Sequence, residues 1–160
     1  MSISIIPAYN HLAEIRELFS EYTDLLVEGD PSFREYLDIQ HYGAELDHPL
    51  DKYGPPGGKL YLALWDGAPA GCIALRRIDA ENCEMKRLYV RPFHRNKGIG
   101  SRLLQTILSD ARAIGYRHML LDTLPFLDRA IQMYMKAGFY EIPIYNDSPM
   151  SSAIYMRLDL

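Results

Sequence analysis

The alternation of apolar and polar residues predicts several strands in the first half of the chain. Residues 2–6 alternate in this way and form the first candidate. Residues 59–65 and 71–78 are two further apolar segments, and between them lies Asp66-Gly67, a pair that favours a two-residue hairpin turn. We therefore expect an early strand and, after a long interval, an antiparallel hairpin.

A third strand is expected over residues 83–90, with one irregularity. Its apolar residues Met85, Leu88 and Val90 are three and then two positions apart, which is not the strict alternation of a regular strand. A β-bulge between Met85 and Leu88 reconciles this spacing with a strand. Bulges are often found next to active sites, so the irregularity also marks this strand as a candidate part of one.

The region between the first strand and the hairpin is expected to be partly helical. Apolar residues recur at helical spacing over residues 12–25, and Asn10 stands where an N-terminal cap is needed. Prolines and glycines then interrupt the pattern over residues 28–58. There we expect one short helix at residues 32–39 and otherwise loop.

The second half of the chain alternates between helices and strands. Residues 98–114 have the most regular apolar stripe of the chain, and Gly115 follows as a C-terminal stop. The later elements are a strand at 118–123, a helix at 125–137, and strands at 139–144 and 152–160. This order predicts a mixed α+β fold with one central, mostly antiparallel sheet of about seven strands and helices on both faces. We expect a single domain over residues 1–160.

Composition narrows the class of protein. The 160 residues carry 17 Lys and Arg against 21 Asp and Glu, a formal net charge of −4, which argues against general nucleic-acid binding. Cys72 and Cys83 do not make a disulfide framework and are expected to be small buried residues. The first ten residues do not resemble a signal peptide, and no apolar run approaches the length of a membrane span. We expect a cytoplasmic protein without a membrane partner.

Charge is spread unevenly along the chain. Residues 21–58 hold nine acids and two bases, whereas residues 76–117 hold four acids and ten bases. The basic part suits an anionic cofactor. The acidic part either attracts a cationic acceptor or is merely a solvated surface.

The main chemical feature is the segment Arg95-Asn96-Lys97-Gly98-Ile99-Gly100-Ser101 before the most regular helix. The free backbone N–H groups and the positive dipole end of that helix would point at whatever lies in the loop. Gly98 and Gly100 have no side chains, so a phosphate can approach the backbone closely. The loop is therefore predicted to bind a diphosphate.

A dinucleotide-binding loop is one alternative. That fingerprint needs a third glycine, where this chain has Leu103, and the preceding strand ends near Val90, well before Gly98. Asp122 does lie about where a ribose-binding acid is needed, so this alternative stays open.

Further motifs surround the loop. They are Leu88-Tyr89-Val90-Arg91-Pro92 before it, and after it Leu103-Leu104, Ala130 and Tyr134-Met135-Lys136-Ala137-Gly138-Phe139. Together with the loop they resemble the GNAT superfamily of acyl-CoA-dependent N-acyltransferases. The resemblance covers about residues 84–139, and the predicted order of elements also suits that fold.

The resemblance implies that acetyl-CoA is the co-substrate. The five histidines show no metal-ligand spacing and the sequence has no Cys–His cluster, so we expect no metal. The loop would bind the CoA pyrophosphate, and backbone groups of residues 88–90 would hold the pantetheine arm like an added strand. The implied cofactor-binding residues are Leu88, Tyr89, Val90, Arg95, Asn96, Lys97, Gly98, Ile99, Gly100 and Ser101. Many members have an asparagine that contacts the pantetheine arm, whereas this chain has Leu127 at that position, which has no amide group.

The resemblance also suggests catalytic residues. An alkylamine attacks only as the free base, which is about one molecule in 10³ at pH 7. Glu84 falls where some members carry the general base that takes up the amine proton. Tyr134 matches the frequent general acid, which protonates the departing thiolate. The acceptor stays open between a small molecule and a peptide amine. The alternative function is an acyl-CoA-binding sensor without catalysis, and a homodimer is compatible with either.

Overall fold

The computed structural model describes residues 2–160 and contains one sheet flanked by helices. The strands are β1 (Ile3–Pro7), β2 (Lys59–Trp65), β3 (Ala68–Arg77), β4 (Asn82–Val90), β5 (His118–Thr123), β6 (Tyr140–Ile142) and β7 (Ile154–Asp159). The helices are α1 (Leu12–Gly29), α2 (Phe33–Ile39), α3 (Tyr42–Asp47), α4 (Leu50–Tyr53), the 3₁₀ turn η1 (Pro92–His94), α5 (Ile99–Ile114) and α6 (Asp128–Ala137).

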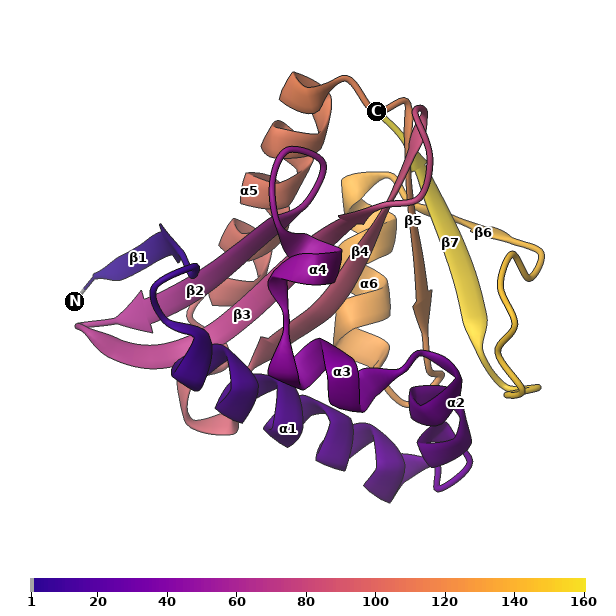
Figure 1. Cartoon of the computed structure of the whole chain (residues 1–160), viewed down its shortest axis with the longest axis horizontal. Coiled ribbons are helices and arrows are strands. Elements are labelled where there is room, and N and C mark those ends of the chain that lie inside the picture. Colours follow the sequence, from indigo (N-terminus) through magenta and orange to yellow (C-terminus); the bar gives the residue numbers. More distant parts are fainter. Residues whose placement is uncertain (1) are drawn as a thin grey trace.

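The seven strands follow the order β1-β2-β3-β4-β5-β7-β6, and only the β4–β5 pair is parallel. The sequence prediction of one mostly antiparallel mixed sheet is therefore confirmed. Helices α1 to α4 lie on one face of the sheet, and α5 and α6 lie on the other (Figure 1). The β2–β3 hairpin turns at Asp66 and Gly67, both at positive φ, as the predicted tight turn requires.

Two apolar layers hold the helices to the sheet. On one face, Leu104 and Ile107 of α5 pack with Ile73 and Leu75 of β3. On the other face, residues of α1 pack with Leu62, Cys72 and Ala74. Successive strand residues thus serve opposite faces, which places the strands between two cores. Cys72 and Cys83 are both fully buried, as expected.

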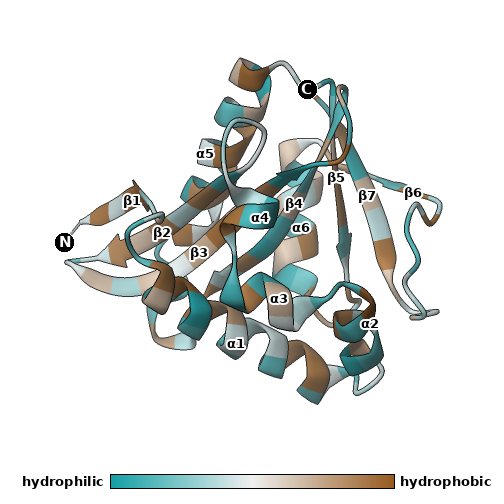
Figure 2. Ribbon diagram, in the orientation of Figure 1, coloured by the Kyte–Doolittle hydropathy of each residue, from teal (hydrophilic) through white to brown (hydrophobic). Residues whose placement is uncertain are grey.

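Strand β4 carries charge inside the sheet. Glu84, Lys86 and Arg87 are among the few buried charged residues of the described chain, and the β4 ribbon has hydrophilic teal segments amid hydrophobic neighbours (Figure 2). Buried charges are costly unless they are paired, so this stretch is a candidate for function.

The predicted bulge is present in β4. Lys86 pairs with Ala74 and Tyr89 pairs with Cys72, so two β4 residues oppose one residue of β3. Arg87, one of the two, has a φ of 58°, which is uncommon for a side chain other than glycine. The bulge therefore redirects the strand between its charged middle and its end at Val90.

Strands β4 and β5 separate beyond their first residues. Their parallel pairing covers only Asn82 to Glu84 of β4, opposite His118 to Leu120 of β5. Both strands continue past that point, and they diverge toward α6 (Figure 1). The backbone of residues 85–90 is therefore free of a partner on that side.

Three local predictions were wrong. The N-cap of α1 is His11 rather than Asn10, and α6 begins at Asp128, three residues later than predicted. Residues 42–53, expected to be loop, contain α3 and α4, which are six and four residues long. Helices of that length show too few turns for a periodic pattern to be recognised.

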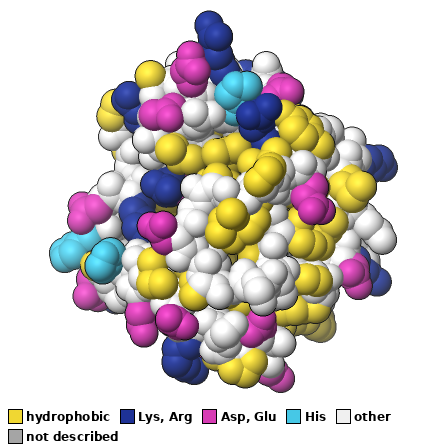
Figure 3. Space-filling view, turned by 90° about the vertical axis from the view of Figure 1, so that its right-hand side faces the viewer, with side chains coloured by type: hydrophobic (Ala, Val, Ile, Leu, Met, Phe, Trp, Pro, Cys, Tyr) yellow, Lys and Arg dark blue, Asp and Glu magenta, His cyan; other side chains and the backbone are white. Residues whose placement is uncertain are grey.

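Figure 3 views the molecule from the side of β6 and β7. Apolar side chains gather over a broad part of this face. Large exposed apolar side chains in the C-terminal part of the chain include Met135 and Ile144. The homodimer stays a prediction. No helix within residues 2–160 is long and apolar enough to cross a membrane.

Candidate active site

A groove of about 590 Å³ opens where β4 and β5 diverge. Residues 88–90 of β4 form one side, the loop and first turn of α5 form one end, and α6 forms the other side. Tyr22 and Leu25 of α1 complete the lining. The groove thus joins the unpaired edge of a strand to the N-terminus of a helix.

The loop before α5 has the backbone form that an anion site needs. Asn96 and Gly98 both have positive φ values, 65° and 78°, and Gly98 is the N-cap of α5. The first N–H groups of α5 therefore end at the groove without a capping side chain. A Cβ atom on Gly100 would lie 3.7 Å from Met133 and 3.8 Å from Val90, two residues that line the groove.

Nine of the ten residues predicted to bind the cofactor line this groove. The exception is Lys97, whose ammonium lies 5.1 Å from the centre of the Trp65 ring and which does not belong to the lining. The Arg95 side chain lines the groove but donates to the Val90 carbonyl at 3.0 Å, which fixes the loop against β4. Lys97 was expected to bind the cofactor, but it does not belong to the groove lining.

Two residues that the sequence analysis did not select bring polar groups to the same end. Arg129 of α6 lines the groove and donates to the Asn96 side chain at 2.6 Å. His94 also lines it, and its Nδ1 atom is buried without a hydrogen-bond partner among residues 2–160. Neither residue belongs to a recognised sequence motif, so the sequence alone could not have shown that they lie at the groove.

Tyr134 lies at the inner part of the groove. Its ring is 5% exposed and packs against Phe139 with 5.7 Å between ring centres. Its hydroxyl has no hydrogen-bond partner in the described part of the chain, and burial raises the pKa of Tyr134 well above its ordinary value. The phenol is therefore protonated at neutral pH and free to donate.

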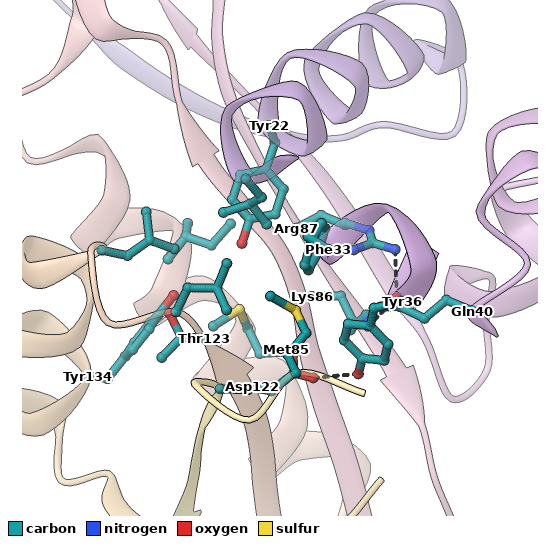
Figure 4. A pocket seen from close by; sticks show the side chains of 16 residues that line it. Tyr22, Phe33, Tyr36, Gln40, Met85, Lys86, Arg87, Asp122, Thr123 and Tyr134 are labelled. Carbon is teal, nitrogen blue, oxygen red and sulfur yellow. Dashed lines mark hydrogen bonds between the residues drawn. The ribbon is translucent and has the colours of Figure 1, made fainter. Parts of the chain in front are cut away.

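A small cavity of about 30 Å³ adjoins the groove on the side of α2. Tyr22, Leu88, Leu127 and Tyr134 line both spaces, so the two meet at the β4 bulge and α6. Figure 4 shows the cavity between α1, α2 and the strands, with Tyr134 on one side and Tyr36 on the other. A reaction that uses both spaces would take place at these shared residues.

Asp122 of β5 supplies a carboxylate to the cavity lining. Its Oδ2 atom accepts from the Tyr36 hydroxyl at 2.5 Å and from the Asn146 amide at 2.9 Å (Figure 4). No side chain within residues 2–160 donates to Oδ1, which leaves that oxygen for a ligand. Burial and the Asp122 charge raise the pKa of Tyr36, so this hydroxyl stays a donor.

Glu84, the predicted general base, lies outside the lining of both spaces. Its carboxylate is 2% exposed in the side chain, pairs with Arg76 at 2.6 Å and accepts a short hydrogen bond from the Tyr145 hydroxyl. Burial opposes its ionisation, but Lys86 and Arg76 lower the pKa of Glu84. Its role as a base stays a prediction.

Two cationic side chains of β4, Lys86 and Arg87, also line the small cavity. Arg87 forms a buried ion pair with Glu45 of α3, 2.9 Å between Nε and Oε2. Lys86 donates to the Gln40 side-chain oxygen at 2.8 Å. Burial lowers the pKa of Lys86, and the Glu84 charge works against that effect. The acidic segment of the sequence thus neutralises part of the basic segment within the molecule.

Solved structures share this architecture. An acetyltransferase from Streptococcus agalactiae matches with a TM-score of 0.76 and 22% identity, over 99% of this chain and 98% of that one. The PaiA N-acetyltransferase from Thermoplasma acidophilum, solved in complex with coenzyme A, also has a TM-score of 0.76, with 21% identity over the full length of both chains. The fold is that of acetyltransferases.

Sequence comparison defines the family. An N-acetyltransferase of Schizosaccharomyces pombe is 35% identical over 162 residues, which cover 100% of this chain and 95% of the relative. The family model described as "Acetyltransferase (GNAT) family" matches residues 12–139. The chain belongs to the GNAT family of acetyltransferases, and the enzyme is an acyltransferase.

Proposed function

We propose that the protein transfers an acetyl group from acetyl-CoA to a primary amine by direct attack in a ternary complex, with one domain over residues 1–160. The observation that carries this proposal is the continuous groove from the α5 N-terminus to Tyr134, which adjoins a second, polar cavity. One space suits a long anionic cofactor and the other suits an acceptor.

The residues of the groove fit coenzyme A. The uncapped N-terminus of α5 and the Arg129 guanidinium together offer donors for a diphosphate. The unpaired edge of residues 88–90 offers backbone groups to an extended amide chain. Bound acetyl-CoA supplies a thioester, whose carbonyl carbon accepts the amine and whose sulfur leaves as a thiolate.

Side chains near the meeting point of the two spaces supply the proton transfers. The amine nitrogen forms the new C–N bond and loses a proton as the C–S bond breaks. Asp122 is the carboxylate that lines the small cavity, and no side chain within residues 2–160 donates to its Oδ1 atom, so we assign it the amine proton and retain Glu84 as the alternative base. Tyr134 donates its proton to the thiolate. The bulge at Arg87 releases backbone N–H groups of β4 from pairing with β3. One of these N–H groups can stabilise the oxyanion that forms on the thioester carbonyl oxygen when the amine attacks.

Two measurements test the proposed function. Calorimetric titration should show that coenzyme A binds, and release of free thiol from acetyl-CoA should depend on an added amine. Binding without amine-dependent release from any primary amine would instead favour the alternative of an acyl-CoA sensor. Absence of both would contradict the assignment of the groove.

Comparing Asp122→Asn with Glu84→Gln should show the larger loss of kcat for Asp122→Asn if Asp122 is the general base.

Substitution of Gly100 by valine should weaken coenzyme A binding by more than about tenfold. The new side chain enters the groove between Val90 and Met133, whereas valine replacing a helical glycine does not weaken the helix. Gly43→Val is the matched control, because Gly43 is an exposed helical glycine with open space around it. Calorimetry should show normal affinity for the control, and equal affinities in both variants would place the cofactor elsewhere.

A further inference from the structure

The small cavity is lined by a buried lysine, Lys86, whose hydrogen-bond partner is a neutral side chain. Lys86 is 7% exposed, and its ammonium donates at 2.8 Å to the Gln40 side-chain oxygen. No salt bridge joins Lys86 to an acid within residues 2–160, whereas its neighbour Arg87 is matched by Glu45. An ammonium in such surroundings is costly to bury, and a bound anion would offset that cost.

Gln40 provides a second, independent observation at the same place. Its Oε1 atom accepts from Lys86 and from Arg87, both at 2.8 Å, which fixes the orientation of the amide. The Nε2 atom on the other side is buried and has no acceptor in the described chain. A buried ammonium whose acceptor is neutral and a buried amide nitrogen without an acceptor in the described chain therefore lie at one wall of the cavity (Figure 4).

The small cavity is also lined by a carboxylate, whose negative charge is opposite to that of Lys86. Asp122 reaches the cavity from β5, and its Oδ1 atom accepts from no donor among residues 2–160. The cavity volume of about 30 Å³ has room for about two water-sized groups, which suits the two oxygens of a carboxylate but not a bulky anion. The rest of an acceptor can extend into the adjoining groove past Tyr134.

We infer that the acceptor is a primary amine that also carries a carboxylate, as an amino acid does, and that Lys86 and Gln40 bind this carboxylate. Asp122 then holds the amino end beside Leu88 and Tyr134, where the two spaces meet. The inference rests on the proposed function, since it assigns the cavity to the acceptor of that reaction. An amine without an anionic group would leave Lys86 without an anionic hydrogen-bond partner and is a poorer acceptor.

The test uses α-, β- and γ-amino acids, each paired with its carboxamide, which keeps the amine and removes the negative charge. With the wild-type enzyme, kcat/KM for the best amino acid should exceed that for its carboxamide by about 10- to 100-fold. Lys86→Met should abolish this preference, mainly through a higher KM. Lys136→Met, which alters an exposed lysine of α6, should leave the preference unchanged.

Binding is measured separately from turnover, by calorimetric titration of the amino acids and carboxamides into protein saturated with coenzyme A. If no amine is acetylated but amino acids still bind through Lys86, the proposed function fails and the carboxylate site stands. If carboxamides bind and react as well as the acids, the inference is wrong, and this comparison needs only wild-type protein. The inference is also wrong if folded Lys86→Met protein still prefers the amino acid to its carboxamide.

Discussion

Replacing Tyr134 with phenylalanine is expected to lower kcat by about 10²–10⁴-fold, the range for loss of a general acid. The thiolate must then leave without a proton from the protein. Coenzyme A affinity and the free energy of unfolding should change little, because the ring keeps its packing against Phe139 and the hydroxyl has no hydrogen-bond partner to lose in the part of the chain that the structure describes. Steady-state kinetics, calorimetry and urea unfolding measure these three quantities.

Tyr140→Phe is the matched control for this substitution. Tyr140 lies on β6, and its hydroxyl bonds to Asp159, away from the groove lining. The control should keep its full rate. Because burial raises the pKa of Tyr134, the wild-type rate should not fall through loss of this proton below about pH 10. A Tyr134→Phe enzyme with undiminished kcat at every pH would remove the residue from the mechanism.

The regular parts of the fold could be predicted because their signals are local. The apolar stripe of α5 and the glycines at both its ends fix that helix within its own sequence. Asp66-Gly67 fixes the hairpin in the same way. Even the β4 bulge left a local trace, since the irregular spacing of Met85 and Leu88 reflects the extra residue at Arg87.

The acceptor side of the site could not be predicted, because it is assembled from distant segments. Gln40 and Lys86 are 46 residues apart, and Tyr36 and Asp122 are 86 apart. None of them belongs to a motif with fixed spacing. Asp122 had drawn notice only as a candidate ribose-binding acid of the dinucleotide alternative, whereas the fold places it in the small cavity.

Side-chain direction limited the prediction of the cofactor loop as well. A sequence shows that Lys97 is next to Gly98 but not that its ammonium lies over Trp65. The fold instead brings Arg129 and His94 to the groove from α6 and η1. Backbone features of the loop therefore followed from the glycines, but the positions of Lys97, Arg129 and His94 did not.

The buried pair of Glu45 and Arg87 should have the largest effect on stability. The Glu45 carboxylate is fully buried, and the Arg87 guanidinium is 3% exposed. Glu45→Gln leaves this guanidinium without a countercharge, and the free energy of unfolding should fall by about 3–5 kcal/mol. The total free energy of unfolding of a natural domain is about 5–15 kcal/mol. Urea unfolding of Glu45→Gln should therefore show a much lower midpoint concentration than that of the wild-type protein.

Two comparisons separate the charge effect from general damage. Replacing both partners by apolar residues, Glu45→Leu with Arg87→Met, should recover most of the loss, because no unpaired charge stays buried. Glu17→Gln removes a partner of Arg91 that is 68% exposed and should change the free energy of unfolding by less than about 1 kcal/mol. A double variant as unstable as the single one would show that packing, not charge, is responsible.

Acid should remove the same stabilisation in the wild-type protein. Burial alone would raise the pKa of Glu45, but Arg87 and Lys52, whose ammonium lies 3.0 Å from Glu45 Oε1, together lower it to about 2. The folded-state pKa is thus below the ordinary value of about 4.3, so the stabilisation is complete above that pH and is lost as the pH falls toward 2. Glu45→Gln has no such carboxylate, and its difference from wild type should therefore shrink between pH 5 and pH 2 in urea unfolding. A difference that stays constant over this range would mean that the Glu45 carboxylate is not held in its charged form by Arg87.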